Sequence, residues 1–373
     1  MAGDTSIRDD LLSRLAHQPQ YIMTGMIKIS NPATPSTITR SPHTSADLGR
    51  LDKLPLELLH FAFSMLDLKT LSSISRTCLR GLAVVESIPE YRDLIRHAPS
   101  MMTALGSTGL IQHHSAHTLH TGLTASQCAS CGDFGPFLFL PTCERCCYEC
   151  LCREQRFRVI TTACAGDCFE LSAASLKKLP TMHNLRGRYS VPFERDLEQR
   201  FRLVSARAVK KLALDEGKSM KVLAENMGKR RHEGFDRLTK WRHIDTLKWL
   251  QAAPIESREV NTQTTSPATR VPVDDFGGLA SIPFPSLKST TCAESGLWCL
   301  GCEETYRDWD PDESGDNDAA RLVAMGSNVY GDVHYTTQVA RSEKGFLEHV
   351  AHCAGAKEIV PDLEEKLRQM KIA

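Results

Sequence analysis

The segment LPLELLHFAFSMLDLKTLSSISRTCLRGL, from Leu54 to Leu82, decides how the N-terminal part of the chain folds. Pro55 stands where the first turn of a helix tolerates a residue without an N–H, and Glu57 places a carboxylate near the positive end of the helix dipole. Asp67 interrupts the apolar run before a second helical segment. The apolar residues recur at spacings of three and four, which predicts three short helices, and they are Leu58, Leu59, Ala62, Phe63, Leu66, Leu68, Leu71, Ile74, Cys78, Leu79, Leu82 and Val85.

Three helices in a segment of only about 35 residues are too small to bury all of these apolar side chains among themselves. Part of the Leu and Phe surface is therefore expected to face a partner. The alternative is that later helices of the same chain cover this surface.

The order of these residues carries a resemblance to a known family. The runs Leu54-Pro55-x-Glu57-Leu58-Leu59 and Phe63-Ser64-x-Leu66-Asp67, with Leu71, Ile74 and Cys78 after them, resemble an F-box. The resemblance covers about an eighth of the chain, and it is to F-box proteins of the fungal type that have a Cys-rich, zinc-binding region downstream. The resemblance implies a three-helix module that docks on the Skp-type adaptor of a cullin-RING ubiquitin ligase. The partner-binding residues that the resemblance implies are Leu54, Pro55, Glu57, Leu58, Leu59, Phe63, Leu66, Leu71 and Ile74.

Length and charge set limits on what the chain does. The 373 residues are enough for two or three compact units. Lys and Arg number 45, as do Asp and Glu, so no overall charge attracts the protein to nucleic acid or to a membrane. The first residues, MAGDTSIRDDLLSRL, lack the basic and apolar pattern of a secretory signal, and no apolar run approaches the roughly 20 residues of a membrane span. An intracellular protein of the cytoplasm or nucleus is expected.

Fourteen cysteines without a secretory signal, several of them in Cys-x2-Cys pairs, indicate thiolate ligands for zinc. The first pair is Cys128 and Cys131, followed by a glycine that permits a sharp reversal. A β-rich stretch, PFLFLP, comes next, and CERCCYECLC then offers two further pairs. Because helix-forming residues follow Cys147, this arrangement resembles a treble-clef finger. The predicted ligands are Cys128, Cys131, Cys147 and Cys150, with Cys143 and Cys146 as the alternative second pair.

A second metal module is predicted near the C-terminus. Cys299 and Cys302 form another spaced pair, and His349 and Cys353 stand four residues apart in a segment with helical character, which would place them on one face. Together they make a Cys3His donor set, and His352 or Cys292 are possible substitutes. Cys164 and Cys168 are also four residues apart. They are either further metal ligands, together with Cys143 and Cys146, or simply buried thiols.

Composition divides the chain into five segments. The fold expected is mainly α, with a three-helix module, a helical region held by a treble-clef-like zinc site with a small β-hairpin, and a second small zinc module. The segments are a disordered tail (1–48), the F-box-like helical module and its extension (49–123), a Cys-rich zinc module with a basic helical region (124–252), a linker (253–288) and a Cys/His module with an acidic insertion (289–373).

No phosphate-binding loop, nucleotide-binding glycine motif or nucleophile elbow occurs, and zinc sites closed by four protein ligands leave no position for an activated water. We therefore expect a non-catalytic protein. The leading hypothesis is a substrate-recognition subunit of a ubiquitin ligase that promotes ubiquitin-dependent degradation of an unknown target. The alternatives are a zinc-dependent nucleic-acid-binding protein that uses basic helices around Lys229-Arg230-Arg231, and a structural scaffold.

Overall fold

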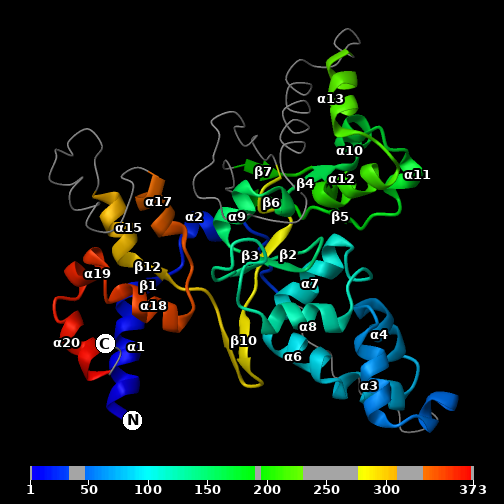
Figure 1. Ribbon diagram of the computed structural model, residues 1–373. Helices are drawn as coiled ribbons and strands as arrows, with labels where there is room; N and C mark the ends of the chain where they lie inside the picture. Colours follow the sequence, from blue (N-terminus) through cyan, green and yellow to red (C-terminus); the bar gives the residue numbers. More distant parts are fainter. Residues whose placement is uncertain (1, 33–46, 190–194, 230–275, 309–330, 371–373) are drawn as a thin grey trace.

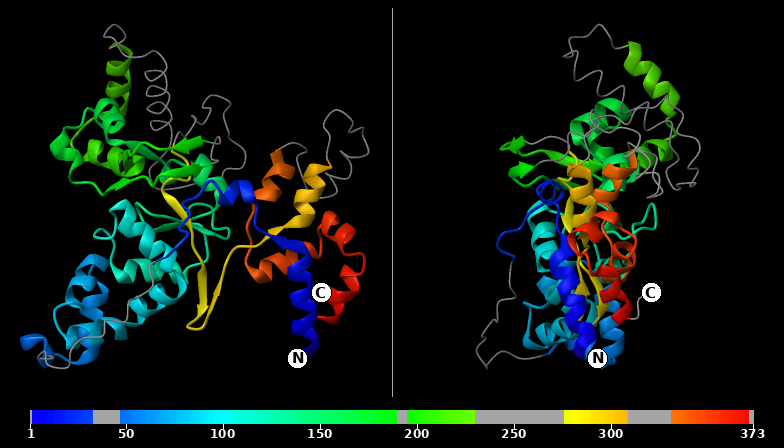
Figure 2. Two further views of the ribbon diagram at one scale, coloured as in Figure 1. Left: turned by 180° about the vertical axis from the view of Figure 1, so that it is seen from behind. Right: turned by 90° about the vertical axis from the view of Figure 1, so that its left-hand side faces the viewer.

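The computed structural model describes residues 2–32, 47–189, 195–229, 276–308 and 331–370. Helices predominate over these residues, and the strands form small two- and three-stranded sheets, as the sequence predicts. Figures 1 and 2 show an N-terminal helical arm, a second unit with its own sheet and a C-terminal module, which extend in different directions from a small central sheet. Within the described residues, no helix is both long enough and apolar enough to cross a bilayer.

The N-terminal helical arm, residues 49–124, begins with a short 3-10 turn and occupies the lower right of Figure 1. Short polar side chains start several of its helices; Asp67 Oδ1, for example, accepts a hydrogen bond from the Thr70 N–H at 2.9 Å. Pro89 and Pro99 take the first positions of two others, where a missing N–H costs nothing. The elements are η1 (Gly49–Lys53), α3 (Leu56–Ser64), α4 (Leu68–Ile74), α5 (Leu79–Ser87), α6 (Pro89–His97), α7 (Pro99–Thr108) and α8 (Ala116–Thr124).

The central sheet joins strands that are distant in the sequence. β2 (Phe137–Phe139) lies between β3 (Glu144–Cys146) and β9 (Ser281–Pro283), and both neighbours run antiparallel to it. The prediction of a linker over 253–288 is wrong for residues 276–288, because Leu279 and Phe284 are buried and β9 completes the sheet. Residues 253–275 lie outside the described part. A further hairpin of β10 (Ser286–Ser289) and β11 (Cys292–Glu294) follows β9.

A buried guanidinium connects this sheet to its surroundings. Arg145, on β3, is only 3 % exposed, yet its Nε donates to the Gly122 carbonyl at 2.7 Å and its Nη1 to the Gly135 carbonyl at 2.6 Å. Nη1 also donates to the Phe284 carbonyl at 3.1 Å, and Nη2 donates to the Pro285 carbonyl. Burial lowers the pKa of Arg145 to about 10, so the group stays charged at neutral pH.

The second unit is built around a three-stranded antiparallel sheet in the order β4-β8-β5 and has a small apolar core of its own, which includes Ile160, Phe169 and Val209. The basic helical region predicted within 124–252 therefore contains strands as well as helices over its described residues. The elements are α9 (Tyr148–Arg153), η2 (Gln155–Phe157), β4 (Val159–Thr161), α10 (Thr162–Phe169), α11 (Ala173–Leu176), β5 (Thr181–His183), β6 (Gly187–Tyr189), β7 (Arg195–Leu197), β8 (Arg202–Ser205), α12 (Ala206–Asp215) and α13 (Met220–Lys229).

The C-terminal module combines the two ends of the chain, as the blue and red segments of Figure 1 show. Its apolar core contains Phe346, Val350 and Leu363, and strand β1 pairs antiparallel with β12. The acidic insertion predicted before α17 lies in residues 309–330, outside the described part. The elements are α1 (Ala2–Leu15), β1 (Ala16–His17), α2 (Gln20–Met23), β12 (Trp298–Cys299), α15 (Leu300–Arg307), α17 (Gly331–Gln338), α18 (Glu343–Val350), α19 (Ala354–Ile359) and α20 (Leu363–Gln369).

The prediction that residues 1–48 form a disordered tail is wrong for residues 2–32. Leu11 and Leu15 of α1 are fully buried in the core of the C-terminal module, and Ile22 and Ile27 are buried in the main core. The segment has too few apolar residues to fold alone, but the partner that covers them comes from the far end of the chain. Residues 33–46 lie outside the described part.

Arg145 gives the first test of this fold. Arg145→Met keeps much of the side-chain volume but leaves main-chain carbonyls from three segments without a donor, so we expect the free energy of unfolding to fall by about 3 kcal/mol. Urea denaturation measures this change. The control is Arg153→Met, which removes an exposed ion pair with Glu149 and should change the free energy by less than about 0.5 kcal/mol. Equal losses in the two variants would contradict a central role for Arg145.

Candidate metal centres and partner surface

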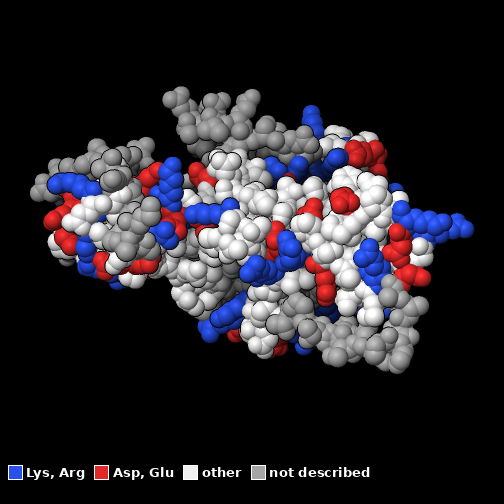
Figure 3. Space-filling view, turned by 90° about the horizontal axis from the view of Figure 1, so that it is seen from below, with Lys and Arg blue, Asp and Glu red and all other residues white. Residues whose placement is uncertain are grey.

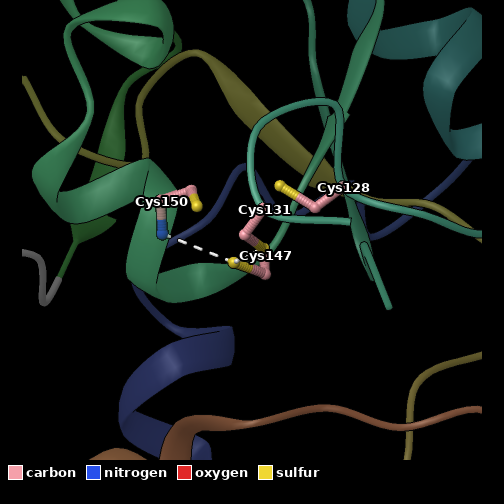
Figure 4. A group of neighbouring side chains, drawn as sticks. All are labelled: Cys128, Cys131, Cys147 and Cys150. Carbon is pink, nitrogen blue, oxygen red and sulfur yellow. Dashed lines mark hydrogen bonds between the residues drawn. The ribbon is translucent and has the colours of Figure 1, made fainter. Parts of the chain in front are cut away.

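The first metal centre forms where the loop before β2 meets the start of helix α9. Cys128 and Cys131 lie in a tight turn that is closed by a bridge between Gln127 and Phe134. Within this turn Gly132 has a φ of 83°, a left-handed conformation that glycine adopts without strain. The second pair, Cys147 and Cys150, occupies the N-cap and the first turn of α9. Figure 4 shows the four side chains, from the loop and from the helix, gathered about one point.

The four sulfur atoms of this centre lie within 4.8 Å of one another. The Sγ atoms of Cys131 and Cys147 are 3.6 Å apart. Main-chain N–H groups point at two of the sulfurs: the Ser130 N–H donates to Cys128 and the Cys150 N–H to Cys147, each at 3.4 Å. These donors, together with the positive end of the α9 dipole, favour anionic sulfur.

Electrostatics show why four such thiols suit a cation. Hydrogen bonds with Cys131 and then with Cys147 and Cys150 hold the pKa of Cys128 far below its usual range, so one thiolate forms readily. The presence of that thiolate in turn raises the pKa of Cys147. A bound dication would stabilise all four thiolates at once, so that the charge on one sulfur would no longer raise the pKa of another. A closed set of four sulfur donors is the set that structural zinc prefers, so these residues fit zinc.

The alternative pair is not part of this centre. Cys143 and Cys146 are both buried, and their Sγ atoms lie against main-chain carbonyls, of Leu140 at 3.7 Å and of Phe137 at 3.9 Å. Burial raises the pKa of both thiols well above the usual value, which favours neutral side chains of the core.

The second metal centre contains the four residues that the sequence predicts. Donor atoms of Cys299, Cys302, His349 and Cys353 lie within 4.8 Å of one another. The Cys302 Sγ is 3.2 Å from His349 Nε2 and 3.8 Å from the Cys353 Sγ. Three thiols and one imidazole also suit zinc, and the alternatives His352 and Cys292 do not belong to the cluster.

The local structure of this centre differs from the predicted one in one respect. His349 and Cys353 were expected on one continuous helix, but α18 ends at Val350 and Cys353 is the N-cap of the next helix. Cys299 likewise caps α15, with Cys302 in its first turn. Both cysteine-bearing elements therefore direct a helix N-terminus toward the sulfur cluster, which the dipole favours.

Two glycines allow the helices of the second centre to approach closely. A Cβ atom on Gly301 would lie 2.2 Å from the Ala356 nitrogen, and a Cβ atom on Gly355 would lie 2.1 Å from the Gly301 oxygen. The main chains of α15 and α19 are therefore in direct contact beside the cluster. The signal for this contact was present in the sequence as Cys-x-Gly-Cys and Cys-x-Gly, but it could not be recognised without knowing that the two helices pack together.

The partner surface predicted for the three-helix segment separates into buried and exposed residues. Leu59 and Leu71 are fully buried and Phe63 is 5 % exposed, so these three hold the helices together and are not available to a partner. Leu66 and Ile74 are half-buried. The exposed residues of the predicted set are Leu54, Pro55, Glu57 and Leu58.

An apolar stripe runs along the exposed face of α3. Leu58, Phe61 and Met65, the C-cap residue, follow one another at spacings of three and four residues, which places them on one side of the helix, and Leu54 lies in extended backbone just before it. Their exposed fractions, in the same order, are 54, 66, 45 and 42 %. Phe61 and Met65 were absent from the predicted set, although their spacing from Leu58 could have revealed them. We call these four residues the α3 stripe.

The basic residues do not form the continuous face that nucleic-acid binding by α12 would need. Arg207 pairs with Glu144 at 3.3 Å, and Lys210 is only 5 % exposed. Arg230 and Arg231 lie outside the described part. The face in Figure 3 carries Lys and Arg interspersed with Asp and Glu rather than a field of one sign.

Comparisons of the chain with protein-family models, with curated proteins and with solved structures found no match. Its function is therefore inferred from the metal centres and the α3 stripe themselves.

Metal analysis tests both centres. The purified chain is expected to hold two zinc ions, one for each cluster. Cys147→Ser and Cys353→Ser should each lower the content to about one ion per chain, because three ligands hold zinc far more weakly than four. Cys292→Ser, which alters an exposed cysteine, is the control and should retain both ions. Full zinc content in either ligand variant would exclude that residue as a ligand.

The close helix contact gives a separate test of the second centre. Gly301→Ala should push α15 away from α19 and reduce the zinc content to about one ion per chain, with no ligand removed. Gly106→Ala is the matched control, since its Cβ would have only the Ile111 Cδ1 nearby, at 3.9 Å. Unchanged zinc content in Gly301→Ala, measured by mass spectrometry of the native protein, would show that the contact is not needed for the site.

Proposed function

We propose that this protein is the substrate-recognition subunit of an SCF-type ubiquitin ligase. Helices α3 to α5 would be an F-box that binds a Skp-type adaptor, and the remainder would bind a target protein. The observation that carries the proposal is the α3 stripe, because four large apolar side chains on α3 and at its two ends remain exposed. The F-box resemblance of the same segment supplies the identity of the partner.

The α3 stripe has the properties of an interface centre. Burying a fully exposed Leu, Phe or Met side chain contributes roughly 1.5 to 3 kcal/mol. About half of each stripe side chain is exposed, so the four together would contribute about 3 to 6 kcal/mol, and contacts around the stripe would have to offset the rest of the cost of association. Side chains such as Leu59 and Phe63 fix the opposite side of the helix in the core. The stripe is therefore held in place before a partner arrives, which lowers the entropy cost of binding.

The two metal centres would have a structural role in this function. Each has four protein donors, and such a set leaves no open position at which a zinc ion could activate water. The first centre has the order of a treble-clef finger: a cysteine turn, the β2-β3 hairpin, and a helix that begins with the second pair. Zinc would stabilise the small units that present the target-binding surface.

The mechanism would be proximity rather than chemistry by this chain. Binding of the adaptor at the α3 stripe and of a target elsewhere would raise the effective concentration of a target lysine near a charged conjugating enzyme. The α3 stripe lies at the far end of the N-terminal arm, away from the second unit and the C-terminal module (Figures 1 and 2), so the two partners would not compete for space.

Co-purification with a Skp-type adaptor tests the proposal. The full chain, co-expressed with the adaptor, should retain it through affinity and size-exclusion steps. Leu58→Asp combined with Phe61→Asp should reduce the amount of bound adaptor by about tenfold or more, because two charges would be desolvated in the interface. Both side chains are exposed, so the fold should tolerate the change.

Leu214→Asp is the matched control for that experiment, since Leu214 is an exposed leucine of α12 outside the α3 stripe and is 41 % exposed. This variant should bind the adaptor as the unaltered chain does. Adaptor binding that survives the double substitution would reject the α3 stripe as the docking surface, and failure of the unaltered chain to bind any Skp-type adaptor would reject the proposed function.

A further inference from the structure

Helix α10 carries a pair of thiols that belongs to neither metal centre. Cys164 and Cys168 are four residues apart on one face of the helix, and their Sγ atoms are 3.6 Å from each other. The predicted partners Cys143 and Cys146 do not join them in a cluster of metal ligands among the described residues. The pair therefore needs another explanation.

The two thiols occupy different environments. Cys168 is fully buried in the small core of the second unit, next to Ala165 and Phe169. Cys164 is only partly buried, and it lies in the first turn of α10, where its N–H donates to the Thr161 Oγ1 at 3.0 Å. One sulfur thus has access to solvent near the positive end of a helix, while the other is enclosed and within contact distance of it.

The hydrogen bond with Cys164, together with burial, raises the pKa of the Cys168 thiol far above its usual value. The two sulfurs lie within hydrogen-bonding distance of each other, and either of them can be the donor. A partly exposed cysteine in the first turn of a helix, with a fully buried second sulfur 3.6 Å away, is the arrangement of a reactive cysteine with a resolving partner.

We propose that Cys164 and Cys168 form a thiol pair that hydroperoxides oxidise to a disulfide. In the first step the Cys164 thiolate attacks one oxygen of the hydroperoxide, the O–O bond breaks, and the sulfur becomes a sulfenic acid while the leaving oxygen takes a proton as water or alcohol. In the second step the Cys168 sulfur attacks the Cys164 sulfur and displaces the hydroxyl, which leaves as water with the Cys168 proton. Two electrons pass from the thiols to the peroxide.

Disulfide formation must deform the helix. Residues four apart on an α-helix have Cβ atoms about 5 to 6 Å apart, whereas a disulfide requires about 3.5 to 4.5 Å. The C-terminal end of α10 is held by α13 and by the turn before it, since Asn226 of α13 donates to the Glu170 carboxylate at 3.1 Å and Lys218 of the turn donates to the Glu170 carbonyl. Disulfide formation should therefore distort the first turn of α10, around Cys164, which packs beside β4.

Trypsin provides a direct readout, because cleavage after Arg158 and Lys177 gives a peptide that contains Cys164 and Cys168 and no other cysteine. The zinc-loaded full chain is treated with hydrogen peroxide, and the remaining thiols are blocked. The chain is then digested with trypsin, and the mass of this peptide is measured by mass spectrometry. We expect a loss of about 2 Da that a thiol reductant reverses. In Cys168→Ser the same treatment should instead leave a sulfenic acid on Cys164, trapped by dimedone, and Cys164→Ser should show neither product.

Two controls complete the test. Cys292→Ser should form the disulfide as the unaltered chain does, and zinc release, followed with a chromophoric chelator, should remain absent at the peroxide concentration used. Amide hydrogen exchange over residues 162–166 should become at least about tenfold faster after oxidation, while residues 206–215 of α12 change less. A peptide that stays reduced, or that gains oxygen on Cys164 without the 2 Da loss in the unaltered chain, would overturn the proposal.

Discussion

The middle of this protein depends on the buried charge of Arg145. The carbonyls that it satisfies come from the end of α8, from the loop after the first cysteine pair and from the segment after β9, as far as Pro285, 140 positions along the chain. None of these segments can move away without leaving a charge unsolvated in the interior. The main-chain carbonyl of the same residue accepts the Ala129 N–H at 2.9 Å, within the cysteine turn. The packing of the core and the shape of the first metal centre are therefore set by one residue.

The metal centres compensate for small cores. The C-terminal module buries only a modest apolar cluster, and its helices are short, so packing alone gives limited stability. A metal ion held by the cluster that joins α15, α18 and α19 would add its binding free energy to the free energy of folding. Strand β1 pairs with the ligand-bearing strand, Ala16 opposite Cys299, and this links the N-terminal helix to the metal centre. The two ends of the chain are thus stabilised together.

Chemistry and recognition occupy separate parts of the molecule. The α3 stripe is supported from behind by buried residues such as Leu59, while one cysteine cluster lies beside the central sheet and the other lies in the C-terminal module. The Cys164 and Cys168 pair lies in a third place, inside the second unit. The α3 stripe, the cysteine clusters and the thiol pair are therefore separate features of the fold, each supported by its own surroundings.

The sequence by itself determined the features that depend on neighbouring residues. The Cys-x2-Cys spacing and the helix-forming run after Cys147 predicted the first cluster, because a turn and a helix N-cap bring their own pairs into position, but only the structure separated Cys147 and Cys150 from the alternative pair Cys143 and Cys146. The second donor set followed from residue chemistry alone, although its local structure did not, since the break between α18 and α19 before Cys353 has no strong sequence signal. Only the tertiary structure decided that α1 is buried, that β9 completes the central sheet and that Phe61 is exposed where Leu59 is not. These outcomes depend on which distant segment covers a given apolar side chain, and local periodicity carries no information about that partner.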